Sequence, residues 1–108
     1  MEDLKEMHCH PVMEGTPPMV EPVISRYLGR LKTQWDVIDK RKLRKSFPFE
    51  NFKRGMAFAQ EVALLAEREE HHPELCIHYS HVDVELGTHS IMGLSENDFI
   101  MAAKIDAI

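Results

Sequence analysis

The sequence predicts an α+β domain in which an antiparallel sheet carries helices packed on one face. Hydrophobic residues recur with helical and strand periods in the order α-β-β-α-β-β-α, so that two strand pairs flank one long helix. Strands that follow one another directly form hairpins, which favours an antiparallel sheet over alternating β-α units. The 108 residues, of which 44% are hydrophobic and 29% charged, fit one small domain.

Residues 1–20 are expected to form a flexible N-terminal extension, with the folded domain at 21–108. Three prolines and a glycine interrupt the extension, and its apolar residues follow no sustained period. From residue 23 the pattern changes, and apolar residues at three-to-four spacing predict a short amphipathic helix within 20–31.

A β-hairpin is predicted after this first helix. The run QWDVID (34–39) is typical of a strand, and a charged turn at 39–42 leads to a second strand through Leu43 and Phe47. Pro48 ends the second strand.

A long helix is predicted from about Glu50 to Glu70, where residues of high helix propensity predominate. Its expected buried stripe follows the 3.6-residue period and consists of Phe52, Met56, Ala59, Val62 or Ala63, and Ala66. Because Pro73 disfavours a helical conformation at His72, the helix should end by about that residue.

The last part of the chain predicts a second hairpin and a final helix. Residues 81–89 alternate strictly, with one apolar face formed by Val82, Val84, Leu86 and Thr88. A shorter strand through Ile77 and Tyr79 precedes them. Ser95 is a good N-cap for the final helix, and Asp98 stands at the third helical position, where it can complete a capping box.

Composition excludes some classes of function. The net charge of −5 argues against nucleic-acid binding driven by phosphate contacts, and the basic run at 40–45 is explained by the turn between two strands. No apolar run reaches the length of a signal peptide or a membrane span, so we expect a cytoplasmic protein that does not bind membranes. Cys9 and Cys76 are expected to be free thiols in a reducing compartment.

The stretch EREEHHPELCIHY (67–79) places two adjacent histidines at the predicted end of the long helix. A shared metal ion is disfavoured, because neighbouring residues of a helix point about 100° apart and no zinc motif spacing is present. Two interpretations remain. His71 and His72 either interact with the helix dipole, with nearby glutamates as solvated partners, or belong to a catalytic site.

A third histidine, His89, favours the catalytic interpretation, because it ends the alternating strand on the polar face. Two segments that each end in histidine can converge on one cleft. Imidazole titrates at a pKa of about 6.5 and suits proton transfer near neutral pH. The chain has no G-x-S-x-G motif and no glycine-rich phosphate loop, so the histidines indicate acid–base chemistry instead of covalent catalysis.

A spaced set of residues resembles the signature of the pterin-4a-carbinolamine dehydratases. The set consists of Glu67, His71-His72-Pro73, Tyr79, His89 and Asp98. Around it, Trp35, SFPFENF (46–52) and THSIMGLSENDF (88–99) are also similar to this family. The resemblance covers about Val23 to Asp106, which is most of the chain.

The resemblance implies a fold with a four-stranded antiparallel sheet and three helices on one face, assembled as dimers or tetramers of the same chain. It also implies dehydration of 4a-hydroxytetrahydrobiopterin to quinonoid dihydrobiopterin, a step of tetrahydrobiopterin recycling, with no metal or other cofactor. In this family, the positions of His71, His72 and His89 surround the pterin and move protons. The division of acid and base roles among the three stays open.

Further positions are assigned by the same resemblance. Substrate binding is expected at Glu67, Pro73, Trp35 and Thr88. Glu67 can hydrogen-bond the pterin or orient an imidazole, and Trp35 is either a core or pocket-wall aromatic or a contact of the ligand. Asp98 is explained by its capping position, with a contact behind His89 as the alternative.

Two other functions are compatible with the resemblance. Some animal relatives stabilise the dimer of a homeodomain transcription factor, and such an interaction module would need exposed apolar residues on the first or last helix. The other alternative is an enzyme that acts on a molybdopterin-related compound.

Overall fold

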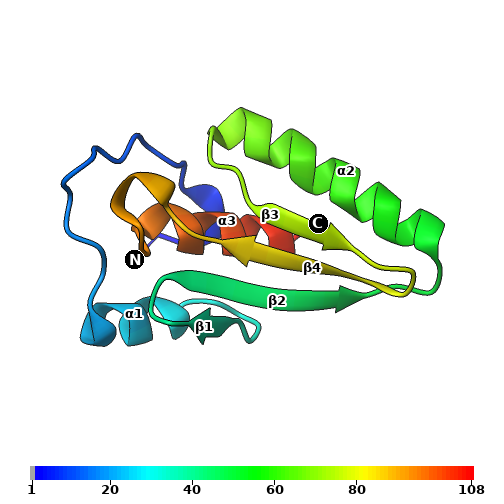
Figure 1. Cartoon of the computed structure of the whole chain (residues 1–108), viewed down its shortest axis with the longest axis horizontal. Coiled ribbons are helices and arrows are strands. Elements are labelled where there is room, and N and C mark those ends of the chain that lie inside the picture. The colour runs from blue at the N-terminus through cyan, green and yellow to red at the C-terminus, as the bar shows by residue number, and fades with distance from the viewer. Residues whose placement is uncertain (1) are drawn as a thin grey trace.

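The computed structural model describes residues 2–108 and contains a four-stranded antiparallel sheet with three helices, which confirms the predicted α+β class (Figure 1). The predicted order α-β-β-α-β-β-α is also confirmed. The elements are α1 (Glu21–Leu28), β1 (Asp36–Ile38), β2 (Lys42–Pro48), α2 (Phe52–Glu69), β3 (Glu74–Ile77), β4 (His81–Leu86) and α3 (Glu96–Asp106).

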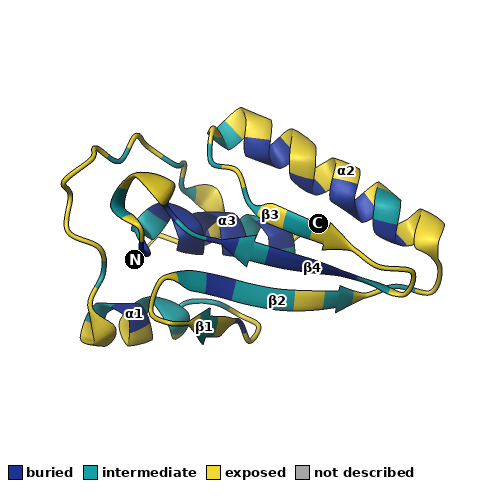
Figure 2. Cartoon of the chain, in the orientation of Figure 1, coloured by how far each residue is buried: buried dark blue, intermediate teal, exposed yellow. Residues whose placement is uncertain are grey.

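The strands are arranged in the order β1-β2-β4-β3, so the second hairpin places β4 at the centre of the sheet beside β2. The predicted alternation of β4 decides which face is buried. Val82, Val84 and Leu86 are fully buried against the helices. Figure 2 shows the same division, with the buried residues of α2 on the side that faces the sheet.

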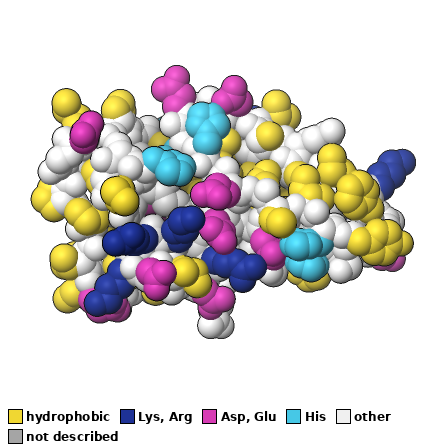
Figure 3. Space-filling model, viewed as in Figure 1, with side chains coloured by type: hydrophobic (Ala, Val, Ile, Leu, Met, Phe, Trp, Pro, Cys, Tyr) yellow, Lys and Arg dark blue, Asp and Glu magenta, His cyan; other side chains and the backbone are white. Residues whose placement is uncertain are grey.

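The opposite face of the sheet is polar and, in the described chain, has no helix over it. The register places Arg44 beside Glu85 and Ser46 beside Asp83. Figure 3 views this open face and shows acidic and basic side chains gathered across its middle. Among residues 2–108, no helix combines the length and the apolar composition that crossing a bilayer requires.

Helix α2 begins at a capping side chain and ends just before a residue in the left-handed conformation. The side chain of Asn51 caps its first turn by accepting a hydrogen bond from the N–H of Arg54 at 2.9 Å. The helix ends at Glu69, and Glu70 follows in the left-handed conformation with φ of 54°. The predicted end before Pro73 is therefore confirmed.

The predicted buried stripe of α2 is wrong at its start, because Phe52 is 45% exposed. The observed stripe is Gly55, Phe58, Ala59, Val62, Leu65 and Ala66. Phe58 takes the aromatic position in the core, where its ring centroid lies 4.7 Å from that of Phe47 and 5.1 Å from that of Phe49. Gly55 faces β4, where an added Cβ would be in ordinary contact with Val82 at 3.4 Å.

The described part of the N-terminal segment (residues 2–20) lies against the helices (Figure 1). Leu4 is buried in the core, and the backbone N–H of Cys9 donates to Glu69 at 2.7 Å. His10 and Asn97 exchange two hydrogen bonds, from the backbone N–H of His10 at 3.1 Å and from the Asn97 amide at 2.6 Å. These contacts connect the segment to the end of α2 and the start of α3.

Candidate active site

A cavity of about 340 Å³ lies where the end of α2, the loop after β4 and the N-terminal segment meet. Its lining includes His71, His72, Thr88 and His89. The structure thus brings together the two histidine-bearing segments, in which His72 and His89 are 17 residues apart in the chain. The volume falls within the range of about 300–1,000 Å³ that is typical of small-molecule sites.

His71 is the most enclosed of the three histidines. It follows the left-handed residue that ends α2, and its side chain is 11% exposed. Its Nε2 lies 2.6 Å from Oδ1 of Asp98, whose side chain is fully buried. Because an ionised carboxylate only accepts hydrogen bonds, Nε2 carries a proton, and in the neutral ring Nδ1 is left as the proton acceptor.

Asp98 connects the cleft to the start of α3. Its Oδ2 accepts hydrogen bonds from the backbone N–H of Ser95 at 3.0 Å and from the Thr88 hydroxyl at 2.8 Å. The predicted capping box of Ser95 and Asp98 is confirmed. The imidazole that Asp98 contacts is that of His71, whereas the alternative considered from the sequence was His89.

His72 points toward the solvent-exposed side of the helix end. Its Nε2 lies 2.6 Å from Oε2 of Glu67, and the two side chains are 62% and 75% exposed. Glu67 was expected to contact the pterin or an imidazole one turn further along. In the structure its carboxylate contacts His72, which follows the left-handed residue Glu70 by two positions.

His89 is held on a tight loop directly after β4. The backbone N–H of Thr88 donates to the carbonyl of Gly93 at 2.9 Å, which closes the loop. Gly93 packs so closely on Pro18 that a Cβ would lie 2.5 Å from it. His89 is exposed and also lines a second cavity of about 190 Å³, which it shares with His72.

Other residues assigned from the resemblance lie outside this cavity. Trp35 does not line it, and is instead 4% exposed in the core, with its indole N–H donating to Asp106 at 3.0 Å. The structure therefore places Trp35 in the hydrophobic core and not in the wall of this cavity. Pro73 directly follows His72 and restricts the backbone there. Tyr79 is 80% exposed beyond the end of β3.

The N-terminal segment contributes cavity residues that the sequence reasoning missed. Cys9, His10 and Val12 line the cavity beside His71 and His72. Burial, followed by the charges of nearby carboxylates, raises the pKa of Cys9 to about 12, so its thiol is neutral near pH 7. The sequence signal that could have identified these residues is a cysteine flanked by two histidines and followed by a proline.

The fold and the cavity define a small α+β protein whose candidate site offers three imidazoles for proton transfer. A family model described as "Pterin 4 alpha carbinolamine dehydratase" matches residues 17–108. The chain belongs to this family.

Relatives match over nearly the whole chain, including most of the N-terminal segment. One from Alkaliphilus metalliredigens is 42% identical over 106 residues, which cover 98% of this chain and 96% of the relative. One from Hydrogenovibrio crunogenus is 44% identical over 106 residues, which cover 97% and 93%. Both carry the name "Putative pterin-4-alpha-carbinolamine dehydratase".

Two solved structures are similar in fold. A "transcriptional coactivator/pterin dehydratase" from Brucella melitensis superposes with a TM-score of 0.76 at 37% identity, covering 83% of this chain and 96% of that one. A "pterin dehydratase-like protein", described as a RuBisCO assembly factor in the α-carboxysome, gives a TM-score of 0.60 at 26% identity. It covers 70% of this chain and 89% of that one.

Proposed function

We propose that this chain is a pterin-4a-carbinolamine dehydratase that converts 4a-hydroxytetrahydrobiopterin to quinonoid dihydrobiopterin and water in tetrahydrobiopterin recycling. Membership of the family supports the reaction class. The observation that carries the proposal is the convergence of His71, His72 and His89 on one cavity. The reaction needs no metal or other cofactor, because loss of water requires only movement of protons.

The chemistry requires two proton-transfer groups. The departing 4a-oxygen needs a proton donor, and a ring nitrogen of the pterin must lose a proton to an acceptor. His71 and His72 each have a carboxylate partner, which orients the imidazole. Among residues 2–108, His89 has no such hydrogen-bonded carboxylate. The division of acid and base roles among His71, His72 and His89 stays open.

The test is the rate of carbinolamine dehydration with purified protein. Wild type is expected to accelerate the reaction over buffer, and His72→Ala or His89→Ala to lower the rate by roughly 10²-fold or more, the usual scale for acid–base groups. His78→Ala is the matched control, since this half-exposed histidine lies in the turn after β3 and does not line the cavity. Its rate should equal that of wild type, and a chelator should have no effect.

Wild-type protein that fails to accelerate dehydration would rule out the enzyme while leaving the fold intact. A parallel assay with a molybdopterin-related carbinolamine tests the other substrate class, and a faster reaction there would replace the proposed substrate.

The interaction-module alternative receives less support from this surface. It requires exposed apolar residues on the first or last helix. The large apolar side chains that are exposed within helices in the described chain, Phe52 and Leu64, belong to α2 instead.

A further inference from the structure

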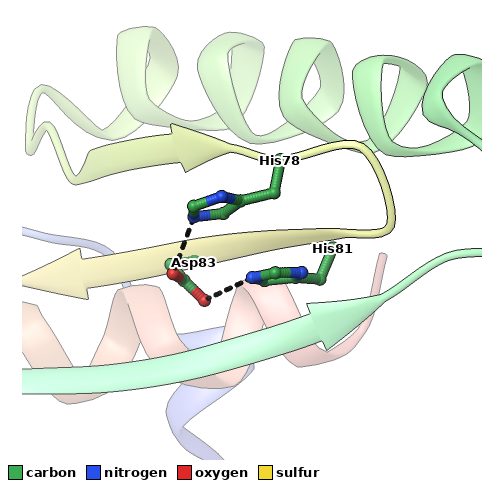
Figure 4. A group of neighbouring side chains, drawn as sticks. All are labelled: His78, His81 and Asp83. Atoms are coloured by element: carbon green, nitrogen blue, oxygen red, sulfur yellow. Dashed lines mark hydrogen bonds and ion pairs between the residues drawn. The ribbon is translucent and has the colours of Figure 1, made fainter.

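Three side chains at the β3–β4 hairpin form a cluster that the proposed dehydratase reaction does not use. His78 lies in the turn after β3, His81 begins β4, and Asp83 follows on the open face of the sheet. One ligand atom from each lies within 4.8 Å of the others. Figure 4 shows both imidazoles directed toward the Asp83 carboxylate. None of the three side chains lines the cavity of about 340 Å³ that contains His71, His72 and His89.

Asp83 is an anionic group that the sheet holds in place. Its Oδ1 accepts a hydrogen bond from the Ser46 hydroxyl, and Nη2 of Arg44 lies 3.1 Å from its Oδ2.

Both histidines present a ring nitrogen to this carboxylate. Nε2 of His78 lies 3.2 Å from Oδ2 of Asp83, and Nε2 of His81 lies 3.9 Å from Oδ1. The other nitrogen of His81, Nδ1, is 3.3 Å from the Ser80 hydroxyl. When Nδ1 donates to that oxygen, Nε2 of His81 keeps its lone pair, which is how metal-binding histidines are commonly oriented. Nε2 of His78, which donates to Asp83, gives up its proton when a metal ion binds.

In a tetrahedral site with bonds of about 2.0–2.2 Å, neighbouring ligand atoms are about 3.3–3.6 Å apart. The two histidine–carboxylate separations of 3.2 and 3.9 Å lie near this range, and all three ligand atoms lie within 4.8 Å of one another. The two rings are stacked, with centroids 4.2 Å apart and planes 15° apart, so one ring must tilt for both lone pairs to meet. The side chains of His78 and His81 are 43% and 37% exposed, which leaves room for that rotation.

We propose that His78, His81 and Asp83 bind one divalent transition-metal ion of the Zn²⁺ class on the open face of the sheet. Two imidazoles and one carboxylate suit zinc, cobalt or nickel, whereas Mg²⁺ and Ca²⁺ prefer all-oxygen sites. The ion links His78 in the turn of the hairpin to His81 and Asp83 in the central strand β4. Because it binds the folded hairpin, it stabilises the domain by mass action.

The probe is Zn²⁺ alone, added to the full chain purified without a polyhistidine tag and followed by calorimetric titration. One equivalent is expected to bind to wild type and to raise the thermal unfolding midpoint. His78→Ala and His81→Ala should each weaken binding by at least about tenfold, since even groups behind a metal ligand contribute about 10–100-fold. Both variants should lose the shift of the midpoint.

The control is the double variant His8→Ala/His10→Ala, which removes the histidines beside Cys9 but leaves the hairpin intact. It should bind Zn²⁺ as tightly as wild type. Cobalt substitution gives a second measurement, because its visible absorption should disappear in His78→Ala. Failure of wild type to bind, or binding that is lost in the control and kept in both hairpin variants, overturns the proposal.

Discussion

Asp98 serves two elements with one carboxylate. Its two oxygens accept hydrogen bonds from His71, Thr88 and Ser95, although the side chain is fully buried. Such a group is costly to bury unless every lone pair finds a donor, and here the donors come from the cleft as well as from the helix cap. The residue therefore positions His71 and also begins α3.

Asp98→Asn separates these two roles. The amide still caps a helix but lacks the second carboxylate oxygen, which contacts Nε2 of His71. We expect the dehydration rate to fall by about 10²-fold, with a changed pH–rate profile. Ser95→Ala is the control, because it removes the capping hydroxyl at a cost of about 1 kcal/mol and leaves the carboxylate. Equal rates in Asp98→Asn and wild type would contradict the positioning role.

At the scale of elements, Glu69 joins the N-terminal segment to the last turn of α2. Burial alone would raise the pKa of Glu69, but hydrogen bonds from the backbone of Cys9 and from His8, with the charge of Lys104, lower it. The ionised carboxylate accepts from the Cys9 N–H at 2.7 Å and from His8 Nδ1 at 2.9 Å. This contact holds Cys9 where it lines the cavity.

The pH dependence of stability tests this placement. Burial is the main reason why the pKa of Cys9 rises from 9.0 to about 12. The folded state therefore keeps a proton that the unfolded state loses, and this contribution to stability is full below pH 9 and is lost as the pH rises toward 12. In urea titrations across that range, the unfolding free energy of wild type should fall more steeply than that of Cys9→Ser. Identical slopes would mean that the thiol is not buried.

The N-terminal segment and α2 also show where sequence reasoning reaches its limit. Prolines remove periodicity from residues 2–20, so one anchoring side chain, Leu4, left no pattern to detect. In α2, apolar residues occur on more than one face, and propensity cannot tell Phe52 from Phe58. Only packing against the sheet determines that Phe58 is buried and Phe52 exposed. The division of the chain at residue 20 stays a prediction.

At the scale of the whole molecule, local signals were sufficient for the order of helices and strands along the chain, but not for the strand order β1-β2-β4-β3. The alternation in β4, the capping box of α3 and the proline after α2 each depend on a few neighbouring residues, and each is found in the structure. The site depends on long-range contacts. The pairing of His71 with Asp98, 27 residues away, cannot be deduced from spacing alone, and neither can the cavity wall formed by Cys9. Self-association of the chain stays a prediction.

The central claim is that a reduced pterin binds among His71, His72 and His89. The most direct measurement is an NMR titration that follows the imidazole resonances of the seven histidines as 7,8-dihydrobiopterin is added. We predict that the resonances of these three rings shift together and saturate, while those of His78 and His81 stay unchanged. Shifts confined to other histidines, or none at saturating pterin, would contradict the account.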